Sequence, residues 1–225
     1  MTQPDAIRGV VFDLDDTLYP ELDFVRSGFR AIAAAFSSRL GPPQAAFDRL
    51  WHEFQTGDRR HVFDRVVSHG TDAADPTLVS RMVDTYRRHM PSLTLFPDAD
   101  RALERLAGRM RLGILSDGAV ETQRNKIAVL ALQSRVNEVI ISDEIGREYW
   151  KPHVRCFEEI AKRLGCSAAE LAYVADNPAK DFVAPNALGW LSIRVRREGG
   201  IYGNVPDAAG GAPQRVIDTL DDLPW

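Results

Sequence analysis

Cysteine is scarce in this sequence, and long apolar runs are missing from it. The two cysteines, Cys156 and Cys166, lack the CxxC spacing of a zinc site, so we expect two reduced thiols. The N-terminal residues show no basic patch followed by an apolar run, and no segment approaches the roughly 18 apolar residues of a membrane span. We therefore expect a cytoplasmic protein without a membrane segment.

A large excess of charge of either sign is also absent. The formal net charge is −4 at pH 7 and the sequence pI is about 5.8, which gives no global electrostatic reason to bind nucleic acid or an anionic membrane. Hydrophobic residues make up 44% of the 225 residues, so a core of useful size can form. A protein with this balance needs a metal ion or a few placed cations to handle an anionic substrate.

What the sequence does contain is a series of short apolar runs rich in β-branched residues. Near-continuous apolar runs suit strands that are covered on both faces, and strands that alternate with helices favour βαβ units. The sequence therefore predicts the α/β class with a doubly wound parallel sheet. The expected strands lie at residues 9–14, 111–118, 138–144, 172–177 and 191–196, and helical patterns lie at 96–110 and 151–165.

The interval between Leu18 and Phe96 breaks this alternation, because it shows amphipathic helical patterns and no convincing strand. We expect residues 1–18 and 97–225 to form the core domain, and residues 19–96 to form a helical cap inserted after the first strand. Such an insert would lie over the carboxyl ends of the strands, where open α/β sheets bind ligands. The expected cap helices are 25–40, 45–54, 61–70 and 77–90, with turns at 41–44 and 71–76, and residues 199–214 are expected to form a loop.

Polar residues follow the first, second and fourth strands. In a parallel sheet all carboxyl ends share one edge, so these groups can converge. A single such carboxylate is usually a solvated loop residue, but clusters at successive strand ends are harder to explain in that way. The clusters are Asp13, Asp15, Asp16 and Thr17, then Ser116, Asp117 and Gly118, then Asp176 and Asp181, while Lys151 precedes the helix that leads to the fourth strand.

Clustered carboxylates repel one another and need a cation. Hard oxygen ligands suit Mg²⁺, which commonly takes one or two carboxylates together with a substrate phosphate oxygen. A divalent ion, a lysine and strand-end amides form a clamp for a phosphoryl group. A carboxylate that faces the clamp can attack phosphorus and form an aspartyl phosphate.

These clusters and their order resemble the motifs of the haloacid dehalogenase (HAD) superfamily. VVFDLDDTL resembles motif I, ILSDG motif II, Lys151 in WKPH the motif III lysine, and YVADNPAKDF the acidic motif IV. The motifs occur in the expected order from about Val10 to Asp181, and the helical insert resembles the C1 cap of subfamily I. Two departures are Ala175, where the family usually has Gly, and Asp117, where related members often have Asn.

The resemblance implies a role for each matching residue. Asp13 would be the nucleophile and a Mg²⁺ ligand. Asp15 would protonate the leaving oxygen and then activate water, and its main-chain carbonyl would bind the metal. Thr17 would orient Asp15. The remaining roles would be phosphoryl binding by Ser116, Asp117 and Gly118, charge stabilisation by Lys151, metal binding by Asp176 and support of the metal site by Asp181.

The predicted function is a Mg²⁺-dependent phosphatase of a small phosphomonoester, such as a sugar phosphate or a nucleotide. Asp15 argues against a dehalogenase, whose halide leaving group needs no acid. Residues 16–109 contain no lysine, which argues against the phosphonate hydrolases, because those use a cap lysine as a Schiff base. A phosphomutase and a non-catalytic HAD-like regulator remain alternatives. A receiver domain would need roughly half this length and no insert.

Substrate selection is expected to involve the segment just after motif I. In a helix that begins near Glu21, Arg26 and Arg30 are four residues apart and share a face. We expect these two residues, together with Tyr19, to face the leaving group of a small phosphorylated metabolite. Two solvated arginines on a surface helix would give the same pattern.

Overall fold

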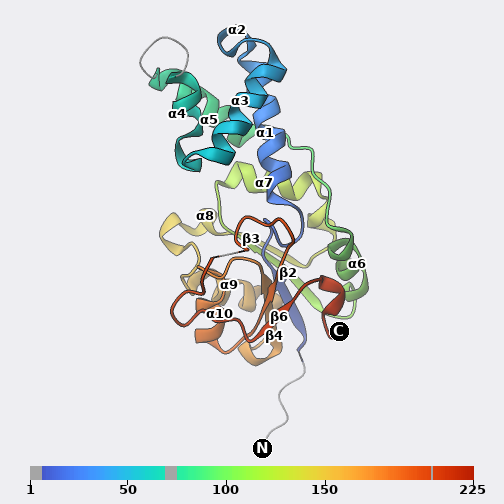
Figure 1. The fold of residues 1–225 in the computed structure, drawn as a ribbon. Coiled ribbons are helices and arrows are strands. Elements are labelled where there is room, and N and C mark those ends of the chain that lie inside the picture. The colour runs from blue at the N-terminus through green and yellow to red at the C-terminus, as the bar shows by residue number, and fades with distance from the viewer. Residues whose placement is uncertain (1–6, 69–74, 204) are drawn as a thin grey trace, which may run out of the picture. The chain divides into compact units, whose positions relative to one another are not determined.

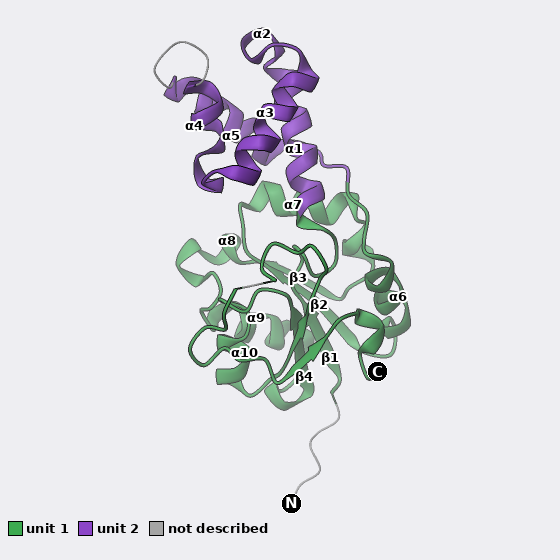
Figure 2. Ribbon diagram, in the orientation of Figure 1, with its two compact units in different colours: residues 1–21, 93–225 green, residues 22–92 purple. Residues whose placement is uncertain are grey.

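The computed structural model describes residues 7–68, 75–203 and 205–225. The predicted turn at 71–76 and the end of the predicted helix 61–70 fall largely outside these ranges. The chain divides into two compact units, which are Met1–Glu21 with Leu93–Trp225, and Leu22–Ser92 (Figure 2). The boundaries predicted after residues 18 and 96 lie within a few residues of these.

The larger unit is built on a six-stranded parallel sheet with the order β3-β2-β1-β4-β5-β6 (Figure 1). This arrangement confirms the predicted α/β class. Each of the five predicted strands is present, although each ends one to three residues earlier than expected, where the polar residues begin. The sixth strand was missed because it has only three residues, none of them buried. The strands are β1 Gly9–Phe12, β2 Arg111–Ser116, β3 Glu138–Ile141, β4 Leu171–Ala175, β5 Leu191–Val195 and β6 Arg215–Ile217.

Register brings the predicted polar clusters to one edge of this sheet. Phe12, the last residue of β1, is opposite Ile114 of β2 and Val174 of β4. Asp13, which follows Phe12, therefore lies beside the ends of β2 and β4, which carry Ser116 and Asp176. Because β2 and β3 lie on one side of β1 and β4 to β6 on the other, this edge is also the point at which the strand order reverses, where open α/β sheets bind ligands.

Two helices of the larger unit, α6 and α9, follow local signals that the sequence shows. Pro97 begins α6, where its missing N–H is not needed, and Gly165 ends α9 with a φ of +66°. The helix α7 was not predicted, because much of its buried face is polar. The buried polar residues are Thr122, Gln123 and Lys126. The elements are α6 Pro97–Leu106, α7 Val120–Val129, α8 Ser142–Ile145, α9 Arg155–Leu164 and α10 Val183–Leu188, with short 3₁₀ turns at Leu132–Ser134, Arg147–Tyr149, Ala168–Glu170 and Leu220–Asp222.

One face of the sheet packs on α9 and α10 through a continuous apolar cluster. Phe157 of α9 lies edge to face against Tyr173 of β4 and Trp190, with ring centroids 4.9 and 5.7 Å away. All residues of β1 and β4 are buried, which explains why these strands read as uninterrupted apolar runs in the sequence.

The smaller unit is helical and has its own aromatic core. The ring of Phe29 lies 5.8 Å from that of Phe54 and 6.1 Å from that of Phe63. A Cβ on Gly28 would lie 2.4 Å from Tyr86, so only glycine allows this close approach of α1 and α5. The predicted helix 25–40 breaks at Phe36 into two. The elements are α1 Glu21–Ala35, which begins in the larger unit, α2 Ser37–Leu40, α3 Pro43–Thr56, α4 Val62–Ser68 and α5 Pro76–Arg88, with a 3₁₀ turn at Arg59–His61.

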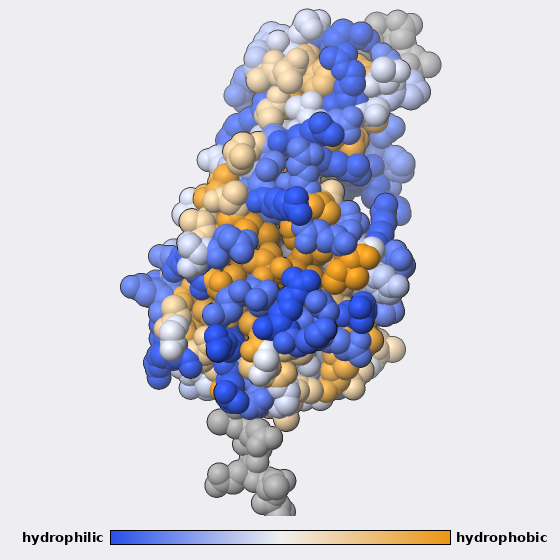
Figure 3. All heavy atoms as spheres, turned by 180° about the vertical axis from the view of Figure 1, so that it is seen from behind, coloured by the Kyte–Doolittle hydropathy of each residue, from blue (hydrophilic) through white to orange (hydrophobic). Residues whose placement is uncertain are grey.

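The surface carries few large apolar side chains. The face in Figure 3 is a mixture of hydrophilic and hydrophobic residues, and the exposed large hydrophobics among the described residues are Met90 and Val216. In the part of the chain that the structure describes, no helix has the length and apolarity to span a membrane.

Candidate active site

The centre of the site is an ion pair between the residue after β1 and a buried lysine. Lys151 Nζ lies 2.5 Å from Asp13 Oδ1, 2.9 Å from Asp181 Oδ1 and 3.0 Å from Tyr173 Oη. Burial opposes the charge of Lys151, but the carboxylates of Asp13 and Asp181 outweigh burial and raise its pKa well above the usual value. Lys151 is therefore held as a cation against Asp13.

Three buried carboxylates form a group that suits a divalent cation. Asp13, Asp176 and Asp181 each offer one oxygen, and these atoms lie within 4.8 Å of one another. Burial raises the pKa of Asp13 to about 7, against the effect of Lys151. Burial and the neighbouring Asp181 and Asp13 raise the pKa of Asp176. Asp181 Oδ1 lies 2.9 Å from Lys151 Nζ, and Asp181 Oδ2 accepts from the backbone N–H of Asn177 at 3.0 Å. An oxygen-only set of three buried carboxylates that crowds negative charge fits Mg²⁺.

Asp15 lies beside this group, and its carboxylate faces α7. Lys126 Nζ lies 2.6 Å from Asp15 Oδ1, and Gln123 Nε2 donates to Asp15 Oδ2 at 3.0 Å. The hydroxyl of Tyr19 also donates to Oδ1. Burial by itself would raise the pKa of Asp15, but the Lys126 ammonium and these hydrogen bonds outweigh burial and hold the pKa below its usual value.

The Thr17 hydroxyl contacts a different carboxylate from the one that the resemblance assigned to it. This hydroxyl donates to Asp176 Oδ1 at 3.4 Å, whereas Tyr19, Gln123 and Lys126 are the residues bound to the Asp15 carboxylate. The two side chains point in different directions, since that of Asp15 faces α7 and that of Thr17 faces the end of β4. In this structure the orientation of Asp15 is therefore set from α7 and Tyr19.

The turn after β2 carries the three residues expected to hold phosphoryl oxygens. Ser116 is buried, and its Oγ is 2.7 Å from Gln123 Nε2. Gly118 has a φ of +132°, and a Cβ there would lie 3.1 Å from Gln123, so a larger residue would be strained. Asp117 accepts from the backbone N–H of Lys151 at 3.2 Å and from Lys180 Nζ at 2.9 Å. The extra negative charge of Asp117 is thus matched by Lys180.

A distant part of the chain fixes the loop after β1. Asp16 adopts a φ of +48°, and its carboxylate accepts from the backbone N–H groups of Glu21 and Ile201, both at 2.8 Å. Arg197 donates to the carbonyl of Thr17 at 2.6 Å. Ile201 belongs to the segment 199–214 that we expected to form a loop, so this segment helps to hold the loop after β1.

The sequence analysis missed Gln123, Lys126 and Lys180. Lysine is rare in this chain, since only four of its 28 Lys and Arg residues are lysines. Lys126, Lys151 and Lys180 each contact a carboxylate of the predicted site. In an arginine-rich chain, the positions that keep lysine were a usable signal, because they depart from the chain's usual choice of cation.

Arg26 and Arg30 lie on α1 in the smaller unit. The Arg26 guanidinium is 3.1 Å from Asp23 and 4.9 Å from the centre of the Trp51 ring, and that of Arg30 is 5.3 Å from the centre of the Phe47 ring. Both side chains thus have partners within that unit, and their contact with a leaving group remains a prediction.

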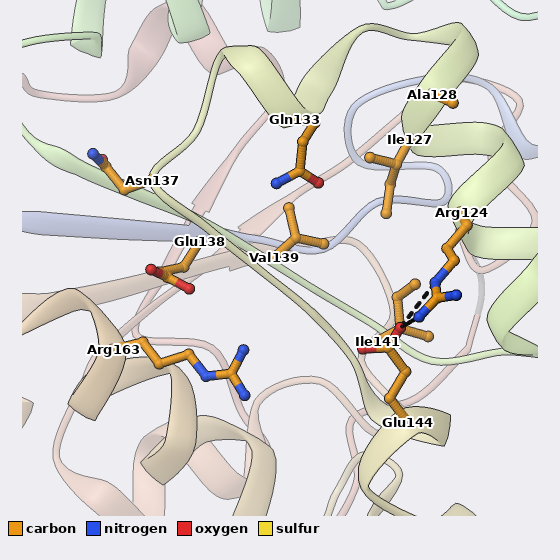
Figure 4. Close-up of a pocket in the computed structure, with 10 residues that line it drawn as sticks. All are labelled: Arg124, Ile127, Ala128, Gln133, Asn137, Glu138, Val139, Ile141, Glu144 and Arg163. Carbon is orange, nitrogen blue, oxygen red and sulfur yellow. Dashed lines mark hydrogen bonds and ion pairs between the residues drawn. The ribbon is translucent and has the colours of Figure 1, made fainter.

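A separate hollow of about 540 Å³ lies beside the edge strand β3 (Figure 4). An ion pair of 2.7 Å between Arg124 and Glu144 lies at its wall. The lining residues belong to α7, β3, α8, α9 and the segment between α7 and β3. This hollow is therefore formed at the outer edge of the sheet, and not by the strand ends that carry Asp13, Ser116 and Asp176.

Comparison with known proteins agrees with this geometry. The model of the haloacid dehalogenase-like hydrolase family matches residues 7–189. A glyceraldehyde 3-phosphate phosphatase of Methanopyrus kandleri is 31% identical over 96% of this chain and 98% of its own length. A phosphoserine phosphatase of Thermus thermophilus is 25% identical over 89% and 92%. The HAD hydrolase YfnB of Bacillus subtilis, solved with magnesium, has a TM-score of 0.68 at 17% identity and covers 97% of each chain, which shows the shared fold. The chain belongs to the haloacid dehalogenase-like hydrolase family.

Proposed function

We propose that this protein hydrolyses small phosphomonoesters through an aspartyl phosphate on Asp13, with Mg²⁺ as its metal ion. It is a phosphatase of the HAD family, in keeping with relatives that include glyceraldehyde 3-phosphate and phosphoserine phosphatases. The observation that carries the proposed mechanism is the convergence of Asp13 with Lys151, Asp176 and Asp181 at the carboxyl end of the central strand.

In the first step, Asp13 Oδ attacks phosphorus as the bond between phosphorus and the leaving oxygen breaks. Asp15, which Lys126 holds as a carboxylate in the free protein, must bind a proton before this step; it then gives that proton to the leaving oxygen, which departs as an alcohol. Lys151, which is already paired with Asp13, stabilises the charge on the transferring group. The Ser116 hydroxyl and the amides near Asp117 and Gly118 bind the phosphoryl oxygens.

In the second step, Asp15 takes a proton from water. The water oxygen attacks phosphorus, and the bond between phosphorus and Asp13 breaks. Inorganic phosphate leaves, and Asp13 returns as a carboxylate. The same carboxyl group thus serves as acid and then as base, which requires that it be held firmly beside the leaving oxygen.

The metal site in this proposal consists of Asp13, Asp176 and the main-chain carbonyl of Asp15. Asp181, whose Oδ1 lies 2.9 Å from Lys151 Nζ, would support this site as a neighbouring buried carboxylate. When bound, Mg²⁺ supplies positive charge to a non-bridging phosphate oxygen and relieves the repulsion among these carboxylates.

The substrate class in this proposal is small phosphorylated metabolites. The relatives named above support it, since their names specify phosphate esters of small molecules. Phosphate release should be measured with p-nitrophenyl phosphate and a panel that contains glyceraldehyde 3-phosphate, phosphoserine, sugar phosphates and nucleotides, in Mg²⁺ and in EDTA. Product analysis on the same panel separates hydrolysis from phosphomutase activity.

Asp13→Asn tests the mechanism directly. An amide is a far poorer nucleophile and a weaker metal ligand than a carboxylate, so turnover should fall to background while the circular dichroism spectrum is retained. Wild-type-like turnover by this variant would contradict the aspartyl-phosphate mechanism. No phosphate release by the wild-type protein from any ester on the panel would contradict the function itself.

A further inference from the structure

The helix α7 presents two buried polar side chains to the predicted acid–base residue. Gln123 is 1% exposed and Lys126 is 5% exposed. They are three residues apart and therefore share one face of the helix. Each contacts a different oxygen of Asp15, with Lys126 Nζ 2.6 Å from Oδ1 and Gln123 Nε2 3.0 Å from Oδ2. The carboxyl group is thus held at both oxygens from one rigid element.

Gln123 also ties Asp15 to the turn after β2. Its Nε2 is 2.7 Å from Ser116 Oγ and 2.6 Å from the carbonyl oxygen of Asp117. Since an amide nitrogen carries two hydrogens, the three acceptors share them, and the three groups are held as one cluster. Movement of α7 would therefore move Asp15 relative to the proposed phosphoryl-binding turn.

Lys126 is costly to bury unless its charge is matched, and Asp15 supplies that match. Its ammonium also lies 5.9 Å from the centre of the Tyr19 ring, and the Tyr19 hydroxyl donates to the same oxygen, Asp15 Oδ1. A purely structural ion pair could lie anywhere on the unit. This pair instead involves the carboxyl group that must reach the leaving oxygen.

We propose that Lys126 and Gln123 are positioning residues, which hold the Asp15 carboxyl group in the orientation needed for proton transfer to the leaving oxygen. The inference rests on the proposed function, because it assumes that Asp15 is the acid. Neither residue touches the phosphoryl group in this proposal. Their contribution should therefore depend on how much help the leaving group needs from an acid.

The test is the rate of single-turnover transfer of the phosphoryl group to Asp13 in Lys126→Met, with esters of different leaving groups. General acid catalysis is worth roughly 10²–10⁴-fold, and loss of one positioning contact should remove part of it, so we expect a fall of about 10- to 100-fold with an alkyl phosphate. With p-nitrophenyl phosphate, whose leaving group needs little protonation, the fall should be less than about 3-fold. Equal losses with both esters would overturn the proposal.

Two further variants separate positioning from folding. Lys126→Arg keeps a positive charge and N–H donors beside Asp15, so the logarithm of the rate should recover at least half of its loss. Lys162→Met removes an exposed lysine from α9 and should leave both rates unchanged. If Lys126→Met lowers the melting temperature strongly, the transfer rates of Lys126→Arg and wild type with the two esters still test whether Lys126 positions Asp15. No recovery with arginine in a folded protein would contradict positioning by charge.

A double-mutant cycle gives the decisive result. If Lys126 acts through Asp15, then Lys126→Met should have no further effect on phosphoryl transfer in an Asp15→Asn background. A full additional loss in that background would show that Lys126 acts elsewhere, for example on substrate binding, and would overturn the inference. Because all comparisons use transfer by an active wild-type enzyme, their failure is distinct from failure of the proposed function, which would abolish the wild-type signal itself.

Discussion

Lys180 Nζ donates to Asp117 Oδ2 at 2.9 Å, and this ion pair joins the turn after β2 to the turn after β4. The Asp117 side chain is only 4% exposed, whereas that of Lys180 is 33% exposed. The charge that aspartate adds beside a phosphate-handling site is thus matched by a lysine that lies 63 residues further along the chain.

This pair predicts coupled stability effects. Lys180→Met removes the ammonium that is ion-paired with the buried Asp117 carboxylate, so the free energy of unfolding should fall by about 1–3 kcal/mol. The double variant Asp117→Asn with Lys180→Met removes both charges and should be more stable than Lys180→Met alone. Urea unfolding of the wild type, both single variants and the double variant measures this coupling. Strictly additive changes would mean that the two residues do not stabilise each other.

A second prediction concerns the metal ion. Activity should require Mg²⁺, vanish in EDTA and be inhibited by excess Ca²⁺. Ca²⁺ prefers six to eight oxygens at about 2.3–2.6 Å, against six at about 2.0–2.1 Å for Mg²⁺, so it should engage both oxygens of Asp13 and hold the nucleophile out of line. Steady-state rates with each ion measure this. Full activity in chelator, or with Ca²⁺ alone, would contradict the metal assignment.

Direct binding gives a readout that is independent of turnover. Asp176→Asn should weaken Mg²⁺ binding in isothermal titration calorimetry, because it removes one of the three clustered carboxylates. Asp222→Asn, which changes an exposed carboxylate in the C-terminal turn, is the matched control and should bind as the wild type does.

A third prediction is a pH-dependent stability contribution from Asp98, at the start of α6. Its Oδ2 lies 2.6 Å from Arg197 and accepts from Thr219 Oγ1 and the backbone N–H of Leu220 at 2.9 and 2.7 Å. Burial alone would raise the pKa of Asp98, but these groups outweigh burial and hold the pKa below its usual value. The folded state therefore favours the carboxylate, and this stabilisation is present at neutral pH.

The sign of the effect follows from that shift. The contribution of Asp98 should be complete above the unfolded pKa of about 3.9 and should be lost as the pH falls through the lower folded value. Asp98→Asn should cost about 1–3 kcal/mol at pH 7, and the difference from wild type should shrink below about pH 4. Urea unfolding between pH 7 and pH 3 tests this. A difference that stays constant with pH would exclude the charge of Asp98 as its cause.

A fourth prediction concerns substrate choice by α1. Arg26→Ala or Arg30→Ala should raise KM for the preferred metabolite and barely change kcat/KM for p-nitrophenyl phosphate, the pattern of lost leaving-group binding. Because each guanidinium lies over an aromatic ring, the change also removes packing. Arg81→Ala is the matched control, since Arg81 lies over Phe36 in the same unit, 5.5 Å from the ring centre. Unchanged kinetics with the preferred metabolite would contradict binding of the leaving group by Arg26 and Arg30.

The sequence by itself determined the class of the fold and the residues at the strand ends. Strands buried on both faces must be continuously apolar, and the positions of Asp13, Ser116 and Asp176 follow directly because they end such runs. The apolar runs and the polar residues that end them are local features, so they can be identified without knowing which segments meet in the fold. The strand β6 and the helix α7 lack them, since β6 has three residues with none buried and α7 buries polar side chains.

The tertiary structure alone decided what surrounds those residues. Lys126 meets Asp15 across 111 positions, and the N–H of Ile201 meets Asp16 across 185. Nothing periodic in a sequence marks such a pairing, because it depends on where the sheet order brings two loops together. The physical reason is burial, since charges removed from water must find partners in the folded protein, and those partners come from whichever element the topology places beside them.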